Sequence, residues 1–188
     1  MEKDYTIDFI KSIVRMFKEY KDKLVYLELG LNKGETFNEI IPYATHMHGV
    51  DISLGLIPKE IMNKVDNNFI NLYESTTDNF FKNVDSNFKV DVAFIDANHT
   101  FEFVKRDFKN VLNILSPGGI ILMHDQDPVS YDFISNENKL CGNAYKMVNY
   151  IIDNYPECNI ITLPLEVSGI SMVQRKNETR IEMLNKNK

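Results

Sequence analysis

Two aspartates follow apolar runs that have the composition of buried strands. Asp96 follows Val90–Ile95, and Asp125 comes shortly after Gly119–Met123. The carboxyl ends of neighbouring parallel strands meet at one edge of a sheet, where ligands bind, so we expect these carboxylates to lie close together. Oxygen ligands of this kind suit Mg²⁺, Mn²⁺ or Ca²⁺ rather than zinc. The spacing predicts a divalent-metal site, with helix or loop capping, or a cofactor contact, as the alternative.

His99 is the histidine of most chemical interest, because it follows Asp96 in the loop above the predicted sheet edge. Imidazole titrates near neutral pH, so this side chain could take a proton from a hydroxyl nucleophile. Capping is the other interpretation. His46 and His48, which flank a predicted strand, are interpreted as structural, and His124 as sheltered inside an apolar run.

A glycine turn follows the first predicted strand. Gly30 leaves the strand without a Cβ, Asn32 tolerates left-handed backbone, and Gly34 lets the next helix pack near the strand. Backbone N–H groups at such a helix start favour a negatively charged or oxygen-rich group. Asp51 ends the second strand about 20 residues beyond the turn, the position at which nucleotide folds bind ribose hydroxyls. The pattern predicts a nucleoside ligand; an ordinary turn and a helix cap are the alternatives.

Two departures from the dinucleotide fingerprint separate the candidate cofactors. Asn32 stands where a nicotinamide site has its second glycine, the residue that admits the pyrophosphate. Glu28 precedes the turn and would repel a pyrophosphate, whereas a carboxylate there attracts the sulfonium and ammonium groups of S-adenosylmethionine. The sequence therefore favours S-adenosylmethionine over NAD.

At this point the chain resembles the class I S-adenosylmethionine-dependent methyltransferases, and within them the macrocin-type and catechol-type small-molecule O-methyltransferases. The resemblance rests on Glu28-Leu29-Gly30 through Gly34 and Thr36, on Asp51, on Phe94 to His99, and on Pro117 to Asp125. It implies a set of cofactor-binding residues: Glu28, Gly30, Gly34, Thr36, Asp51, Ile52, Glu74, Ser75 and Asp96.

The same resemblance implies roles in catalysis. Asp96, Asp125 and Gln126 would hold Mg²⁺, and His99 and Asp96 would be the catalytic residues. The expected reaction is methyl transfer to a hydroxyl of a small molecule, with the metal lowering the pKa of the acceptor. An NAD(P)-dependent oxidoreductase and a non-catalytic nucleoside-binding subunit are the alternatives.

The elements that position these residues alternate in type. Helical periodicity appears in residues 5–20, 100–115 and 141–154. Strand–helix repetition with continuous apolar strands predicts a doubly wound, Rossmann-like α/β sheet of seven strands, mostly parallel. Pro164–Ser168 has room only for a turn, so the final strand is expected to be antiparallel. Seven apolar runs are the predicted strands: Leu24–Leu29, His46–Asp51, Asn68–Leu72, Val90–Ile95, Gly119–Met123, Asn159–Leu163 and Gly169–Val173.

Composition limits the remaining alternatives. A chain of 188 residues with 44% hydrophobic residues is expected to form one domain, residues 1–174, with a basic, flexible tail at 175–188. The net charge of -6 argues against a nonspecific nucleic-acid binder. No signal peptide, membrane span or disulfide framework is evident, so we expect a cytoplasmic protein. The loop 126–140 is expected to shape the substrate pocket, and the 5–20 helix to be a lid, an outer helix or a homodimer contact.

Overall fold

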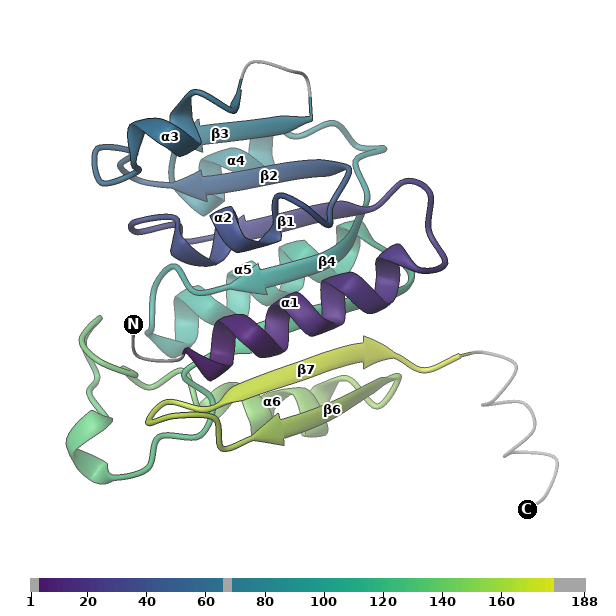
Figure 1. Ribbon diagram of the computed structural model, residues 1–188. Helices are drawn as coiled ribbons and strands as arrows, with labels where there is room; N and C mark the ends of the chain where they lie inside the picture. Colours follow the sequence, from purple (N-terminus) through teal and green to yellow (C-terminus); the bar gives the residue numbers. More distant parts are fainter. Residues whose placement is uncertain (1–3, 66–68, 178–188) are drawn as a thin grey trace, which may run out of the picture.

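Strands and helices alternate along the chain, as the sequence pattern predicts (Figure 1). The computed structural model describes residues 4–65 and 69–177. None of the described helices is long and apolar enough to cross a membrane. The elements are α1 (Tyr5–Lys18), β1 (Val25–Leu29), α2 (Glu35–Ile40), β2 (His46–Asp51), α3 (Lys59–Met62), β3 (Ile70–Glu74), α4 (Thr77–Asn83), β4 (Val90–Ile95), α5 (Phe101–Ile114), β5 (Leu115–His124), the 3₁₀ turn η2 (Tyr131–Phe133), α6 (Lys146–Asn154), β6 (Cys158–Leu163) and β7 (Ile170–Arg175).

The strands form one sheet in the order β3-β2-β1-β4-β5-β7-β6. Neighbours from β3 to β5 are parallel, whereas β7 is antiparallel to both β5 and β6. The predicted fold class is confirmed, including the single reversed strand. The chain order changes direction between β1 and β4, which are adjacent, and ligands bind at such switch points in α/β sheets.

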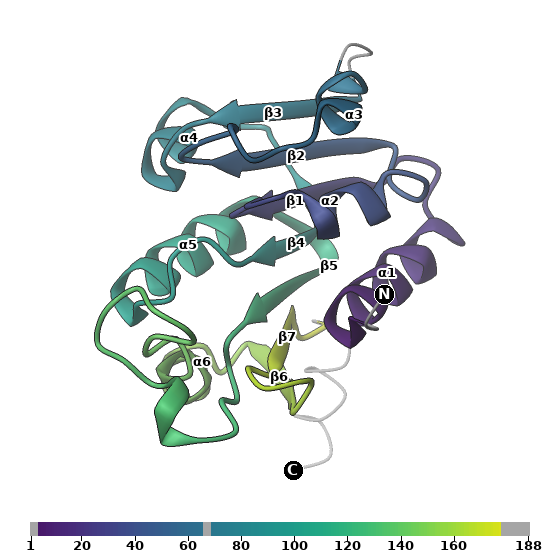
Figure 2. The same ribbon diagram turned by 60° about the vertical axis from the view of Figure 1, so that its left-hand side comes forward.

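Helices cover both faces of the sheet (Figure 2). One apolar cluster joins α1, α2 and α3 to one face, and a second joins α4, α5 and α6 to the other. The residues of β4 are all buried because this central strand is covered on both sides. Along α1, Ile10, Val14 and Phe17 recur at helical spacing and are buried against the sheet. The 5–20 segment is therefore an outer helix of the fold.

Some predicted boundaries shift for local reasons. The helix expected over 141–154 begins at Lys146, and turns occupy residues 141–145, where Gly142 takes a positive φ of 53° that a helix does not allow. The last strand continues to Arg175, which pairs with Cys158, so the tail does not begin at residue 175. Residues 178–188 of the predicted tail lie outside the described residues.

The end of β1 makes direct contact with the end of β4. Gly30 has φ 88°, and a Cβ built on it would lie 2.2 Å from the carbonyl oxygen of Asp96. Real side chains never approach a backbone atom so closely, so only glycine fits at this position. The absence of a side chain at residue 30 thus allows the carboxyl ends of the two strands to meet.

Replacing Gly30 with Ala should therefore lower the free energy of unfolding by about 3 kcal/mol, since strain at a positive φ and a backbone clash act together. Urea unfolding monitored by circular dichroism measures the loss. Gly118→Ala is the matched control, because Gly118 has φ 76° but, apart from its chain neighbours, no described residue comes within 4 Å of its Cβ position. The control should lose only about 1 kcal/mol. Equal losses in the two variants would contradict the clash.

Candidate active site

A cavity of about 210 Å³ lies at the carboxyl end of β1. The end of the strand, the glycine turn, the first residues of α2 and the first turn of α1 surround it, with Asp96 from the end of β4. This is the crevice in which doubly wound folds bind nucleotides. The lining residues are Asp4, Ile7, Glu28, Gly30, Leu31, Asn32, Lys33, Glu35, Thr36 and Asp96.

Carboxyl groups dominate the charge of this cavity. Glu28 is 2% exposed, and its Oε2 accepts a hydrogen bond of 2.7 Å from the hydroxyl of Tyr26. Burial, assisted by the charge of Asp96, raises the pKa of Glu28 to about 8 against the opposing hydrogen bonds from Tyr26 and the backbone of Phe37. Glu28 is therefore largely protonated at neutral pH, and a cation bound beside it would favour its ionised form.

Asp51 binds the glycine turn itself. Its Oδ2 accepts the backbone N–H groups of Leu31 at 2.8 Å and Asn32 at 2.9 Å, and its Oδ1 accepts that of Ser53 at 3.0 Å. Asn32 has φ 49°, the left-handed conformation expected from its residue type. The acid at the end of β2 thus holds the turn in shape, and its role as a ribose ligand stays a prediction.

The other predicted cofactor residues lie outside the cavity lining. Ile52 is 75% exposed, Glu74 accepts the N–H of Leu54 at 3.0 Å, and the Ser75 N–H donates to the carbonyl of Asp51. They form the neighbouring part of the same sheet edge, at the ends of β2 and β3. A Cβ on Gly34 would meet the side chains of Ile57 and Ile61. The missing side chain at Gly34 therefore makes room for the segment around α3, and not for the strand as expected from the sequence.

Two carboxylates and two imidazoles come together beside this cavity, where β4 and β5 end. Asp125 Oδ2 lies 3.0 Å from Nδ1 of His99, and Asp96 Oδ1 lies 3.1 Å from Nδ1 of His124. The remaining cross distances, His99 Nε2 to Asp96 and His124 Nδ1 to Asp125, are both 3.7 Å. The expected proximity of Asp96 and Asp125 is thus observed, with two histidines between them.

The carboxylates hold protons on both imidazoles. Burial alone would lower the pKa of His99, but the hydrogen bond and charge of Asp125, with the charge of Asp96, raise it to about 9. The pKa of His124 is likewise raised to about 9, mainly by Asp96, against the effect of burial. Burial opposes the ionisation of Asp125, yet its pKa is lowered because both imidazolium groups favour the carboxylate. At neutral pH His99 is therefore protonated and cannot accept a proton until the charge of Asp125 is neutralised.

The segment 138–143 positions His99. Asn138 accepts the His99 N–H at 2.8 Å, the Leu140 carbonyl contacts Nδ1, and the Asn143 N–H donates to the His99 carbonyl at 3.0 Å. A Cβ on Gly142 would lie 2.1 Å from that carbonyl, so glycine permits this contact. Part of the loop that the sequence assigns to the substrate pocket is therefore packed on the acid–imidazole cluster.

The donor set fits a divalent cation. Ligand atoms of Asp96, His124 and Asp125 all lie within 4.8 Å of one another. Nε2 of His124 lies 2.8 Å from Ser168 Oγ. When Nε2 carries the proton and donates it to this hydroxyl, the lone pair of Nδ1 faces the two acids, and this arrangement is typical of a metal-binding histidine. Oε1 of Gln126 is buried and has no hydrogen-bond partner among the described residues, while its amide donates to the His124 carbonyl at 2.7 Å. Such an orphaned oxygen is suited to a cation or a water molecule.

His124 was not recognised as a functional residue from the sequence, where it is interpreted as sheltered. Its side chain is 22% exposed, and it points at the acids because the strand ends at this residue. Asp125 has φ 62°, an uncommon conformation for a residue with a side chain, and such residues cluster at functional sites. The adjacent His-Asp pair at the end of a predicted strand is the signal in the sequence that could have revealed the site.

Comparisons with known proteins agree with this geometry. A family model described as a methyltransferase domain matches residues 27–126, more than half of the chain, and the chain belongs to this family. The class I methyltransferase assignment and the Rossmann-like fold are thereby confirmed. A search of curated protein sequences finds no match.

Solved structures are similar in fold at low sequence identity. An O-methyltransferase from Bacillus cereus, in complex with SAH, has a TM-score of 0.74 at 15% identity, covering 94% of this chain and 83% of that one. The O-methyltransferase TomG from Streptomyces achromogenes, in complex with SAM, has a TM-score of 0.70 at 9% identity, covering 94% of this chain and 82% of that one. An rRNA methylase from Streptococcus thermophilus has a TM-score of 0.66 at 12% identity, covering 94% of this chain and 99% of that one.

The acid–imidazole cluster makes stability depend on pH in the metal-free protein. Both histidines have a pKa raised from 6.5 to about 9, so their contribution is complete below pH 6.5 and is lost as the pH rises through 9. We expect the urea midpoint, measured in EDTA, to fall between pH 6.5 and 9. Asp125→Asn should reduce this fall, whereas Asp127→Asn should not. An equal fall in all three proteins would contradict the pairing.

Proposed function

We propose that this methyltransferase transfers the methyl group of S-adenosylmethionine to a hydroxyl oxygen of a small molecule, with a divalent cation at the acid–imidazole cluster. The observation that carries the proposal is the position of two adjoining sites at one sheet edge: an acid-lined cavity at β1, and the cluster of Asp96, His99, His124 and Asp125 beside it. Asp96 belongs to both, so a cofactor and an acceptor bound there would be neighbours, which is the main requirement of a displacement reaction.

The charge of the cavity favours the sulfonium cofactor. Four carboxyl groups and one lysine line it, so a pyrophosphate would meet repulsion whereas an ammonium or sulfonium group would be attracted. This supports S-adenosylmethionine over NAD(P), the alternative expected from a nucleotide-type turn. Glu28, Gly30, Thr36 and Asp96 would hold the amino-acid part. Asp51 would hold the ribose, with Gly34 shaping the turn and with Ile52, Glu74 and Ser75 beside the adenine.

Binding of the cofactor should release a proton, because a cation beside Glu28 lowers the pKa of about 8 that burial gives it. Isothermal titration of S-adenosylmethionine at pH 7 in buffers of different ionisation enthalpy measures this release. Glu28→Gln should abolish it while retaining part of the affinity, and Glu35→Gln is the matched control from the same cavity. No binding at millimolar cofactor would reject the cofactor assignment.

The cluster is suited to ionising an acceptor hydroxyl. A bound divalent cation supplies a positive charge that lowers the pKa of a hydroxyl coordinated to it. Asp96, His124 and Asp125, with Gln126 adjacent, are the side chains that would hold it. Neutralising Asp125 and Asp96 removes the carboxylate charges that raise the pKa of His99, so the pKa falls and His99 becomes better able to accept the hydroxyl proton. The imidazole of His124 shifts the expected metal from Mg²⁺ or Ca²⁺ toward Mn²⁺ or another first-row ion.

Metal binding should compete with protons. The histidines carry a pKa of about 9, so Mn²⁺ affinity should rise between pH 7 and pH 9 as the cluster deprotonates. Isothermal titration of the metal-free protein at the two pH values measures this. Asp125→Asn and His124→Gln should each weaken binding about tenfold or more, while Asp127→Asn should not. Methyl transfer that is unchanged by EDTA and by Asp125→Asn would reject a metal role.

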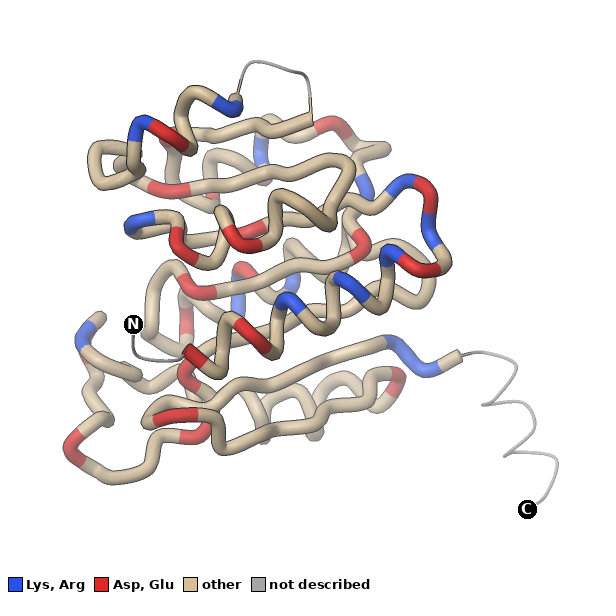
Figure 3. The backbone as a smooth tube through the Cα atoms, in the orientation of Figure 1, with Lys and Arg blue, Asp and Glu red and all other residues tan. Residues whose placement is uncertain are grey.

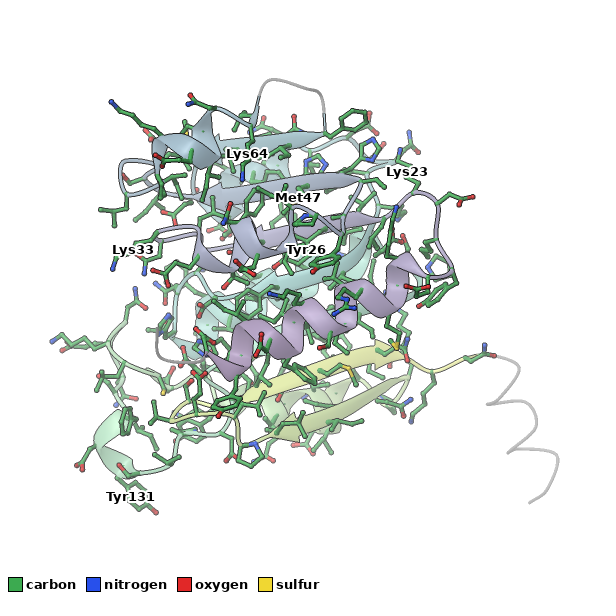
Figure 4. All side chains as sticks on the ribbon, viewed as in Figure 1. Lys23, Tyr26, Lys33, Met47, Lys64 and Tyr131 are labelled. Atoms are coloured by element: carbon green, nitrogen blue, oxygen red, sulfur yellow. The ribbon has the colours of Figure 1, made fainter. Side chains whose placement is uncertain are left out.

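The acceptor is the least defined part of the proposal. Because a similar fold occurs in an rRNA methylase, fold alone does not choose between small molecules and nucleic acid. The net charge of -6 supports a small molecule over a polyanion. Tyr131 of η2, within the loop 126–140, is 91% exposed and projects outward from the fold (Figure 4), where it is available to contact an acceptor. Screening hydroxylated acceptors with methyl-labelled cofactor also tests the alternative of a nucleoside-binding subunit, which would bind without turnover.

A further inference from the structure

A second cavity lies at the opposite edge of the sheet, where the parallel strands begin. Its volume of about 410 Å³ is within the range of small-molecule sites. The loop between α1 and β1, the start of β2, the segment before β4 and the start of β5 contribute to it. Figure 4 shows the labelled Lys23 at this edge and Lys33 at the other. The lining residues are Lys21, Lys23, Val25, His46, His48, Asn87, Phe88, Lys89, Asp91 and Ser116.

Positive charge predominates in this amino-edge cavity, in contrast to the cofactor crevice. Three lysines line it, from the loop before β1 and the segment before β4, and Asp91 is the one acid among the lining residues. Asp91 is buried and fully engaged: Oδ1 lies 2.5 Å from Nζ of Lys21, and Oδ2 accepts the Val25 N–H at 2.9 Å. Among the described residues, Lys23 and Lys89 have no carboxylate partner, although Nζ of Lys89 donates to the carbonyl of Asn113 at 3.2 Å. Figure 3 shows blue segments alternating with red ones in the loop between α1 and β1, at this end of the molecule.

Neutral donors and an aromatic wall complete the cavity. Burial and the charge of Lys23 lower the pKa of His46, and burial lowers that of His48 to about 4, so both rings are neutral at pH 7. Nδ1 of His48 lies 3.1 Å from the hydroxyl oxygen of Tyr73, and the His48 ring packs edge-on against Phe88. Between the described residues, no hydrogen bond uses Nε2 of either histidine. These rings can therefore donate to an anion, while the lysines supply the charge.

We infer that the amino-edge cavity binds the phosphate group of a small molecule. Lysines from two separate segments line the cavity together with His46, His48 and Ser116. This arrangement matches a tetrahedral oxyanion better than a planar carboxylate, and lysine acts at phosphate sites as a point charge. The cavity lies at the other end of the strands from the cofactor crevice, so the two sites are separate.

The test uses inorganic phosphate, ribose 5-phosphate and AMP, titrated into the full chain at low ionic strength, with and without S-adenosylhomocysteine. Calorimetry measures affinity, and the ring signals of His46, His48 and His99 are followed by NMR. We expect binding that shifts the rings of His46 and His48 but not that of His99, and that is unchanged by S-adenosylhomocysteine. Equal affinity for the three probes identifies phosphate alone as the ligand, and tighter binding of AMP identifies a nucleotide whose base stacks on Phe88.

The variants remove two charges in each case. Lys23→Ser/Lys89→Ser should weaken phosphate binding roughly tenfold or more, since two positive charges without a carboxylate partner are lost. Lys59→Ser/Lys146→Ser removes the same net charge from exposed positions outside the cavity and should leave the affinity unchanged. Absence of binding at about 10 mM phosphate, a concentration at which a ligand with a Kd of about 1 mM would nearly saturate the site, would overturn the inference. An equal loss in both double variants, or displacement by S-adenosylhomocysteine, would also overturn it.

The titration without S-adenosylhomocysteine stands independently of the proposed methyl transfer. Failure of the cofactor to bind would reject the proposed function and leave the phosphate result intact. Failure of the phosphate titration leaves the cofactor crevice untouched, because no residue lines both cavities.

Discussion

The candidate site depends on direct backbone contact between β1 and β4 where these strands end. Residue 30 has no side chain, so the turn after β1 lies against the carbonyl of Asp96. That contact places Asp96 at the crevice that Glu28 lines and, from the same position, within reach of His124 on β5. One steric constraint therefore connects the cofactor crevice to the acid–imidazole cluster, and displacing the turn would disturb both.

Both parts of the site hold protons that a cation would displace. Glu28 is protonated at neutral pH because it is buried, and His99 and His124 are protonated because two carboxylates face them. In the free protein these protons offset negative charge that would otherwise repel itself. The opposite sheet edge has the reverse arrangement, with lysine charge and neutral imidazoles. The sheet thus separates a region suited to cations from one suited to anions.

The sequence predicted those features that depend on short-range patterns. Gly30 and Asn32 take the positive φ that their residue types permit, and the one reversed strand follows from the short turn after Leu163. It did not reveal that His124 faces the acids, because that direction depends on where β5 ends and on the unusual backbone of Asp125. Nor did it indicate the amino-edge cavity, whose lining comes from four distant segments and forms no local motif. Side-chain direction and long-range assembly are properties of the packed sheet and not of a sequence window.

The position of β7 has a consequence for how the molecule is made. This strand lies between β5 and β6 and is the last of the three to leave the ribosome. Until it arrives, β6 has no neighbour in the sheet, and β5 has an open edge with unpaired backbone groups, a known template for association with other chains. Synthesis proceeds from the amino end, so the strands from β1 to β5 can assemble before β7 is available to join β6 to the sheet. A premature stop before residue 170 would therefore leave two strands exposed, and aggregation would be the expected fate of the shortened polypeptide.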